Sequence, residues 1–322
     1  MRKLLFMLLC WGGLPHLFRY FNRHALTVLL YHGVAPKRAQ GIYNYRGNYI
    51  SPEAFRGHLG YIARHYNVLP LDESLQRLRE HTLPRYALAI TFDDGYQNFY
   101  SHALPLLKEF RMPATIFLVT DFVLQKKPLW VDRLEYAIGQ KEVSREERIE
   151  EDIRVRAELK NLPSSKRERR LEAIERQTGA ALRDFSGERA VYAALTESEI
   201  KDMQEGGITL GGHTKSHPVL SHLSDGEATE EIVGSRRALE EHFGVISQVF
   251  CYPYGRWNEK TEQLVTEAGF TGALTTIQGV NSADTHPYRL RRFTMDGVDD
   301  IGRCAAVISG MRLFLRRLKH TF

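Results

Sequence analysis

Cysteine is scarce in this chain, whose 322 residues include only Cys10, Cys251 and Cys304. An odd number of widely separated cysteines is not the framework of a disulfide-stabilised secreted domain. None of them has the close spacing of a structural zinc site. The sequence therefore implies no disulfide scaffold, and it permits a reducing compartment.

A long apolar run is also missing. Residues 1–11 combine two early cations with the apolar stretch of a short signal peptide, but no small-x-small cleavage site follows. Leu9 does not suit lipoprotein processing at Cys10, and the stretch is too short to span a bilayer. We therefore expect residues 1–25 to contain an amphipathic N-terminal helix. The expected location is the cytoplasm or the inner face of the membrane, with export on an uncleaved N-terminal anchor as the alternative.

No nucleic-acid motif accompanies the net charge of +5 and the pI near 9.0, so we expect no nucleic-acid partner. A basic helix is predicted at about 303–320, where apolar residues recur at helical spacing between cations. Both terminal helices could contact an anionic membrane face. The alternative is that they pack onto the body of the protein.

Apolar runs typical of strands alternate with helix-like stretches along most of the chain. Hydrophobic residues make up 43% of the sequence, which suffices for one barrel-sized domain with an insertion or for two domains. The strand-like runs lie at about 26–31, 66–70, 87–92, 114–119, 207–211, 248–252, 271–275 and 288–294. This alternation predicts an α/β fold of parallel strands joined by crossover helices. In a barrel of this kind, function gathers at the carboxyl ends of the strands.

The alternation stops between about 126 and 196. Within it, residues 141–176 are dense in Glu, Arg and Lys and contain no strand-like run, which predicts a charged helical insertion. Such a charge pattern is typical of a solvated helical face, and an interaction arm or substrate lid is the alternative. Trp130 could line a sugar cleft as a substrate contact, although tryptophan more often has a buried core role.

Two adjacent carboxylates, Asp93 and Asp94, follow the apolar run 87–92 and precede Gly95. Neighbouring side chains on a strand point to opposite faces, but a bend at glycine allows both to enter one site. An isolated Asp-Asp-Gly sequence is more often a turn or a helix cap. It therefore needs partners before it indicates catalysis.

Such partners follow a second strand-like run. His213 and His217 are four positions apart, directly after two glycines. With one carboxylate, two imidazoles make a three-ligand site with open positions, which is typical of a catalytic metal. Among thirteen histidines this spacing arises easily by chance. Because both motifs end strand-like runs, we favour a shared metal site.

These motifs resemble those of the polysaccharide deacetylases, the NodB-homology domains of carbohydrate esterase family four. Residues 91–95, Thr-Phe-Asp-Asp-Gly, match the family's first motif, and residues 213–217, His-Thr-Lys-Ser-His, match its second. A third match is Tyr-Pro-Tyr-Gly at 252–255. The resemblance implies a deformed (β/α) barrel of seven strands over residues 26–322.

The resemblance also implies a metal and a base. It assigns a divalent metal to Asp94, His213 and His217, and the role of catalytic base to Asp93. Zinc is the default for these ligands, although iron, cobalt or nickel would also suit them.

In the third motif, the resemblance assigns the oxyanion to the backbone N–H of Tyr254, and we take Tyr252 and Pro253 as candidate substrate contacts. The family usually opens this motif with an arginine that orients the base. Here that position is Cys251, so the orienting group must come from elsewhere.

Arg292 is our candidate for that replacement, because it lies on the predicted strand 288–294 and its guanidinium could hold Asp93. The alternative is that Arg292 belongs to a basic strand end exposed to solvent. The catalytic role of Arg292 therefore depends on whether its strand lies beside the strand of Asp93.

The family's late histidine, which acts as general acid, has no clear counterpart after residue 255, where only His286 is a candidate. The first strand-like run ends in Tyr31-His32-Gly33, which resembles a circularly rearranged family branch associated with exopolysaccharides. The histidine of that Tyr-His pair is the acid in that branch. We therefore expect His32 to be the acid, with a buried histidine at a strand end as the alternative.

The function predicted from these residues is metal-dependent removal of N-acetyl groups from amino sugars. The expected substrate is a cell-surface glycan or its lipid-linked precursor. A deformylase of a lipid-linked formamido sugar would need the same chemistry. A catalytically silent glycan-binding barrel is the alternative of a different class, which the missing arginine and displaced acid keep open.

Overall fold

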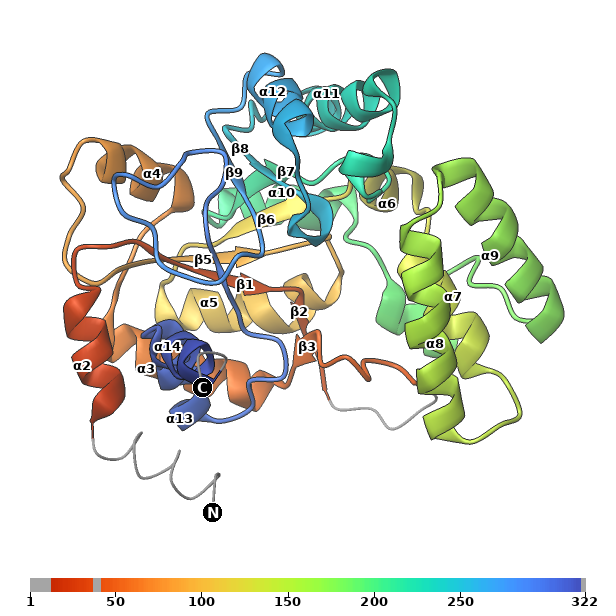
Figure 1. Ribbon diagram of the computed structural model, residues 1–322, viewed down its shortest axis with the longest axis horizontal. Helices are drawn as coiled ribbons and strands as arrows, with labels where there is room; N and C mark the ends of the chain where they lie inside the picture. The colour runs from red at the N-terminus through yellow and green to blue at the C-terminus, as the bar shows by residue number, and fades with distance from the viewer. Residues whose placement is uncertain (1–12, 37–41, 320–322) are drawn as a thin grey trace.

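The computed structural model describes residues 13–36 and 42–319 (Figure 1). Within these residues Cys251 and Cys304 are free and buried, and no helix is long and apolar enough to cross a membrane. The signal-like stretch 1–11 and Cys10 lie outside the described residues.

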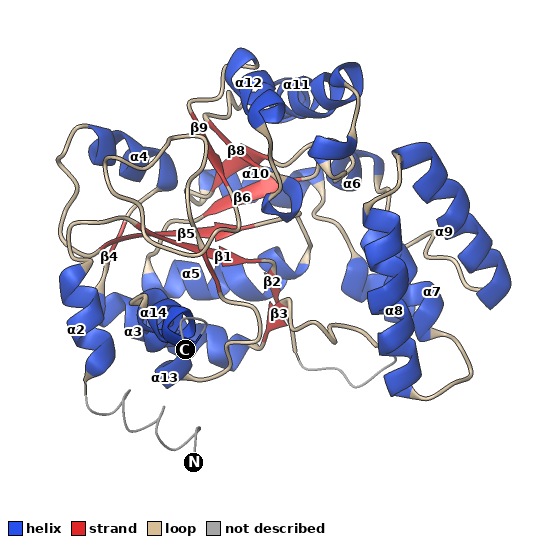
Figure 2. Ribbon diagram, in the orientation of Figure 1, coloured by secondary structure: helices blue, strands red, loops and turns tan. Residues whose placement is uncertain are grey.

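A curved parallel sheet forms the centre of the molecule, with its main path in the order β10-β1-β5-β6-β7-β8-β9 and β4 paired beside β5 (Figure 2). An isolated parallel bridge joins Leu274 to Leu290, so the segment before β10 nearly closes the barrel. This confirms the α/β barrel-like fold predicted from the alternation of runs. The strands are β1 (Thr27–Tyr31), β4 (Asn67–Val68), β5 (Ala87–Phe92), β6 (Thr115–Leu118), β7 (Thr209–Gly212), β8 (Val249–Cys251), β9 (Gly272–Leu274) and β10 (Phe293–Thr294).

The central strands are buried on both faces, which explains their continuous apolar runs. Every residue of β1 and β5 is buried, as expected where helices cover a parallel sheet. Helices surround the strands in the ribbon view (Figure 2). They are α3 (Pro52–His65), α4 (Leu71–Arg79), α5 (Leu104–Phe110), α10 (Glu197–Glu205), α11 (Asp225–Phe243) and α12 (Glu259–Glu267).

The insertion predicted at 126–196 is helical. Its helices α7 (Trp130–Gly139), α8 (Arg145–Lys160) and α9 (Ser164–Thr178) lie to one side of the sheet (Figure 1). Leu134, Leu159 and Leu171, one from each helix, are fully buried in a common hydrophobic cluster. Because these helices bury apolar side chains against one another, the insertion has a small core of its own.

The two ends of the described chain lie together, where α2 (Leu14–Phe21) packs against α14 (Met311–Lys319) (Figure 1). The rings of Phe18 and Phe314 are 5.1 Å apart between centroids. Where the sequence predicts one helix at about 303–320, the structure has α13 (Ile301–Ile308) and then α14. Gly310, with φ +85, separates them because the left-handed conformation ends a helix.

Two short segments also differ from the sequence-based expectation. The predicted strand 288–294 pairs continuously only at Phe293–Thr294, and Arg292 immediately precedes this pairing. A two-stranded sheet of β2 (Gly33–Val34) and β3 (Tyr49–Ile50) follows β1. Such two-residue strands are too short to produce a recognisable alternation.

Glycine at position 211 is required by close packing inside the sheet, which generates a stability prediction. A Cβ at Gly211 would lie 2.3 Å from the ring of Phe117, its buried partner on β6. We expect Gly211→Ala to lower the free energy of unfolding by about 1–3 kcal/mol, since added volume strains a packed core. Urea denaturation measures this effect.

Gly226→Ala is the matched control. Gly226 is exposed in the first turn of α11, and a Cβ there meets nothing within 4 Å. This variant should be as stable as the parent or more so, because alanine favours a helix over glycine. Equal losses in both variants would contradict the packing argument.

Candidate active site

The carboxyl ends of parallel strands bring the motif residues together at one edge of the barrel. His32 follows β1, Asp93 and Asp94 follow β5, and His213 follows β7. These strands run in the same direction, so their ends meet despite large separations in sequence. The glycine expected to bend the chain after the carboxylates does so, because Gly95 has φ +100.

Asp94, His213 and His217 form a compact group of potential metal ligands. All three are buried, and one ligand atom from each lies within 4.8 Å of the others. The Nε2 atoms of both histidines are 3.5 Å from the same Asp94 oxygen, Oδ1. The geometry suits one ion held by two imidazoles and a carboxylate.

The surroundings of the two histidines affect how they could bind a metal. The Nδ1 atom of His213 is 2.7 Å from the backbone oxygen of Cys251, so Nδ1–H donates and Nε2 presents a lone pair. Burial lowers the pKa of His217 to about 3, whereas at His213 the effect of burial is outweighed by Cys251 and Asp94, which raise the pKa. A bound metal requires both imidazoles in the neutral form. The donor set therefore fits a divalent metal.

A second group, Asp93, His213 and Cys251, also satisfies the distance criterion for a metal site. However, the Arg292 guanidinium lies 2.8 Å from Asp93 and 3.0 Å from the Cys251 sulfur. A cation already occupies the space beside these two ligand atoms. The group that contains Asp94 is therefore the better candidate for holding a metal.

Arg292 holds Asp93 through two parallel hydrogen bonds. Its Nη1 and Nη2 atoms donate to the two carboxylate oxygens at 2.8 Å each, and the arginine is fully buried. Burial alone would raise the pKa of Asp93, but Arg292 outweighs this effect and holds the pKa below its ordinary value. Arg292 therefore orients the Asp93 carboxylate, which is the contact expected of the arginine that this chain lacks at position 251.

Cys251 explains how an arginine from another strand reaches this place. The Cys251 side chain is small and buried, and its sulfur lies beside the ion pair, 3.0 Å from Nη2 of Arg292 and 3.4 Å from Oδ2 of Asp93. The remaining donors of Arg292 reach the Thr275 carbonyl oxygen at 2.9 Å and the Thr91 hydroxyl at 3.2 Å. Each of these partners helps to fix the guanidinium in one orientation.

His32 follows β1, which lies on one side of β5 in the sheet. The second and third motifs follow β7 and β8, which lie on the other side of β5. The Nδ1 atom of His32 is 3.2 Å from Oδ1 of Asp296, which follows β10. Burial alone would lower the pKa of His32, but Asp296 and the two motif aspartates raise it to about 9. His32 is therefore protonated at neutral pH, as a proton donor must be.

Asp296 was not predicted from the sequence. It lies 264 residues after His32 and belongs to no recognised motif. The only available signal was its place just beyond the last strand-like run. The other candidate acid, His286, is about half exposed and lies 3.7 Å from Glu262 of α12, so it takes no part in this group.

Backbone conformations of high energy concentrate at the site. Of the nine non-glycine residues with positive φ in the described parts of the chain, four belong to the motifs: Asp94 (φ 78), Thr214 (φ 68), His217 (φ 58) and Tyr254 (φ 60). Each such residue costs of the order of 1–3 kcal/mol and persists only where surrounding structure imposes it. This clustering supports a functional role for the loops that carry them.

The aromatic candidates have mixed surroundings. The Tyr254 ring covers His217, with 4.7 Å between centroids. Tyr252 and Pro253 are buried, and the Tyr252 ring packs 5.5 Å from that of Phe250. Trp130 is 5% exposed and belongs to the core cluster of the insertion. Burial favours a packing role for Trp130 and Tyr252, as the sequence-based alternative for Trp130 anticipated.

Fold and site together define a hydrolase with a barrel-like α/β fold, whose reactive groups lie at one edge of the sheet. The family model described as polysaccharide deacetylase matches residues 80–273, which is more than half of the chain. The chain belongs to this family and is a carbohydrate deacetylase. The identification made from the three motifs is confirmed.

Known relatives agree with this assignment. YxkH of Bacillus subtilis, named for the same family, is 23% identical over 269 residues, which cover 83% of this chain and 70% of YxkH. The poly-β-1,6-N-acetyl-D-glucosamine N-deacetylase of Staphylococcus epidermidis is 29% identical over 75 residues, which cover 23% of this chain and 26% of that enzyme. The solved structure of IcaB from Ammonifex degensii has a TM-score of 0.59 at 21% identity, covering 87% of this chain and 97% of IcaB. The last likeness concerns the fold alone.

Removal of the buried Arg292 charge should expose the cost of the buried Asp93 carboxylate. We expect Arg292→Gln to lower the free energy of unfolding by about 3–5 kcal/mol, since it leaves a buried charge unpaired. The double variant Arg292→Gln/Asp93→Asn should be more stable than Arg292→Gln alone. Urea denaturation of the parent, Arg292→Gln, Asp93→Asn and the double variant measures the coupling between the two residues. Strictly additive losses of stability would contradict a direct ion pair.

Zinc titration distinguishes the two candidate ligand groups. His217→Ala and Asp94→Asn should each weaken zinc binding by more than about 100-fold in calorimetry, because even outer-shell partners contribute 10- to 100-fold. Cys251→Ser should bind zinc nearly as tightly as the parent. A large loss in Cys251→Ser with retention in His217→Ala would assign the metal to the other group.

Proposed function

We propose that this deacetylase is metal-dependent and removes N-acetyl groups from amino sugars of a cell-surface glycan or its lipid-linked precursor. The observation that carries the proposal is the pairing of two units in one buried site. Asp94, His213 and His217 form the ligand group, and Asp93 beside it is oriented by Arg292. The partial match to a poly-β-1,6-N-acetyl-D-glucosamine N-deacetylase supports an N-acetyl amino sugar as substrate.

The three ligands fit zinc best, although iron, cobalt or nickel would suit the same donors. A divalent metal bound there would polarise the acetyl carbonyl and acidify a water molecule. Asp93 then needs only modest basicity, which is consistent with the lowered pKa that Arg292 imposes on it. Each carboxylate oxygen keeps a lone pair beyond its bond to Arg292, so Asp93 can still accept the proton of water.

His32 is proposed as the acid that protonates the leaving amine. The Asp296 carboxylate orients its ring through Nδ1, which leaves Nε2–H as the available donor. The backbone N–H of Tyr254 is proposed to stabilise the oxyanion of the tetrahedral intermediate. The Tyr31-His32-Gly33 sequence also supports membership of the circularly rearranged, exopolysaccharide-associated branch.

A substrate panel tests this function. Purified, metal-loaded protein is incubated with acetylated oligosaccharides and lipid-linked sugars while released acetate and formate are measured. Acetate release with first-order dependence on enzyme is the expected result. Formate alone would assign the deformylase activity, and glycan binding without release of either acid would assign a silent binding barrel.

Three variants separate the proposed roles. Asp93→Asn should keep its metal and lose turnover, because an amide cannot accept the proton. His32→Ala should lower kcat by about 10²–10⁴-fold, which is the usual contribution of acid–base assistance. Asp296→Asn should lower kcat less than His32→Ala does, since it only orients the ring. Metal content, measured by atomic emission, should equal that of the parent in all three, and unchanged kcat in His32→Ala would contradict the assignment of the acid.

We also propose that the paired terminal helices bind the anionic inner face of the membrane. Four large apolar side chains on α2 and α14 are strongly exposed: Leu17 (49%), Tyr20 (51%), Phe21 (69%) and Phe314 (47%). Arg316 on α14 and Arg23 after α2 place cations beside them. Apolar side chains rimmed by cations suit an interface with anionic lipid.

Sedimentation with vesicles tests the membrane proposal. The protein should sediment with vesicles that contain anionic phospholipid, and Tyr20→Ser/Phe21→Ser should bind markedly less because two apolar contacts are lost. Ile246→Ser removes a similarly exposed apolar side chain outside the two helices, so it should bind like the parent. Equal loss in both variants, or no sedimentation of the parent, would contradict the proposal.

A further inference from the structure

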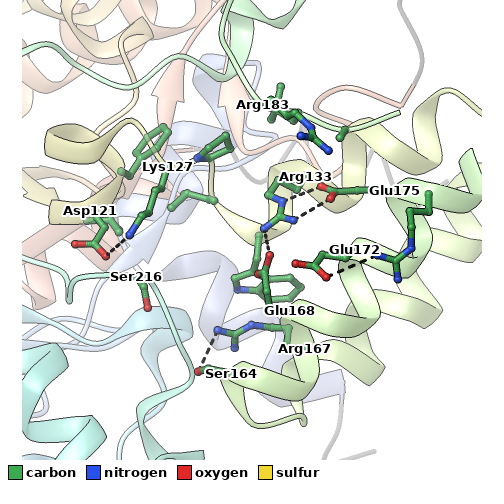
Figure 3. Close-up of a pocket in the computed structure, with 18 of the residues that line it drawn as sticks. Asp121, Lys127, Arg133, Ser164, Arg167, Glu168, Glu172, Glu175, Arg183 and Ser216 are labelled. Carbon is green, nitrogen blue, oxygen red and sulfur yellow. Dashed lines mark hydrogen bonds and ion pairs between the residues drawn. The ribbon is translucent and has the colours of Figure 1, made fainter. Parts of the chain in front are cut away.

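A cavity of about 1200 Å³ lies between the helical insertion and the barrel (Figure 3). Its lining includes side chains from α6 (Thr120–Gln125), α7 and α9, and also Ser216, which lies between the ligand candidates His213 and His217. Pockets for small ligands are usually about 300–1,000 Å³. The cavity is therefore large enough for several linked sugar rings, and it shares the loop of the second motif.

Every carboxylate that lines this cavity already has a cationic partner. The ion pairs are Asp121–Lys127, Glu168–Arg133, Glu175–Arg133 and Glu172–Arg176. Figure 3 shows the pairs of Arg133 and of Glu172 along the wall formed by α7 and α9, with Asp121 and Lys127 apart from them. The lining as a whole contains these four carboxylates and five cations, Lys127, Arg133, Arg167, Arg176 and Arg183, so its formal charge is positive and favours an anionic ligand.

Two cations of the lining, Arg167 and Arg183, have no ion pair among the described residues, and of these two only Arg167 is buried. Arg167 is 7% exposed, and its hydrogen bond to the Ser164 hydroxyl is a long contact of 3.4 Å. Among the described residues no carboxylate lies within ion-pair distance of it, and burial lowers its pKa below the ordinary value. A buried cation without a counterion is costly, so a ligand that supplies an anion would be bound favourably.

An aromatic wall connects this arginine with the active site. The guanidinium of Arg167 lies over the Trp130 ring, 5.3 Å from its centroid. The Trp130 ring is 6.4 Å from that of Tyr254, which in turn covers His217 at 4.7 Å. The indole therefore fixes Arg167 in place, two rings away from a metal-ligand candidate. These ring contacts, and Ser216 in the lining, place the cavity next to the loop that carries the second motif.

We infer that the cavity is a subsite for an acidic glycan, in which Arg167 binds a carboxylate or phosphate group on a sugar near the one that is deacetylated. The inference rests on the proposed function, because it names the class of substrate for the same site. Arg167 presents a planar fork of donors that matches such anions. The uncharged glycans of the same backbone should bind less tightly.

The first experiment uses the unaltered protein. Calorimetry compares oligosaccharides of alternating N-acetylglucosamine and glucuronic acid with the same oligosaccharides after reduction of their carboxyl groups to alcohols. We expect at least about 10-fold tighter binding of the acidic form, because charge-assisted hydrogen bonds are the stronger ones. Equal affinity for both forms would overturn the inference, and this comparison needs no variant.

Competition identifies the anion. Inorganic phosphate and free glucuronate are each titrated against the bound acidic oligosaccharide. Stronger displacement by phosphate would assign a phosphate-bearing sugar, and stronger displacement by glucuronate would assign a carboxylate. Absence of displacement by both would contradict an anion site at Arg167.

A pair of variants locates the effect. Arg167→Gln should reduce the preference for the acidic form to nearly none. Arg169→Gln removes an exposed arginine from the same helix α9, outside the cavity lining, and should keep the preference. Thermal unfolding checks that both variants are folded. Equal losses in the two variants would indicate a general charge effect rather than this subsite.

Turnover separates failure of the subsite from failure of the proposed function. Acetate release from the acidic and the reduced oligosaccharides with equal kcat/KM would retain the deacetylase and reject the subsite. Tight binding of the acidic form without acetate release from any oligosaccharide would retain the subsite and reject the N-deacetylase proposal.

Discussion

The buried ion pair between Arg292 and Asp93 is the interaction on which the site depends. It joins residues 199 positions apart, and it exists only because β10 and β5 both lie beside β1. Two charges at this depth are costly, and the pair is tolerated because the guanidinium has further partners in the Thr275 carbonyl, the Thr91 hydroxyl and the Cys251 sulfur. The barrel thus fixes the Asp93 carboxylate in one orientation.

Around this fixed carboxylate, the motif loops adopt conformations that isolated chains would avoid. The left-handed backbone at Asp94 and His217 aims both side chains at one point. The cost is offset by the buried strands, since the residues of β5 are packed on both faces. The stability of the buried sheet therefore compensates for the strained loops at its edge.

The insertion adds a second layer to that edge. Its small core places Trp130 against Tyr254, and Lys160 at the end of α8 lies 4.4 Å from the centroid of the Tyr254 ring. The insertion thus places an aromatic ring and a cation beside the third-motif residue Tyr254. In this arrangement the barrel carries the family motifs, and the insertion lies beside them.

The sequence alone determined what depends on neighbours in the chain: the strand runs, the Asp93-Asp94 turn, the His213 and His217 spacing, and the resemblance that they carry. Tertiary structure decided the rest, because it depends on which strands lie side by side. The order β10-β1-β5 brings Asp296 to His32, and it also brings Arg292 into contact with Asp93, which decides between the two interpretations of Arg292. The cavity at Arg167 likewise arises from packing between distant segments, which no local pattern encodes.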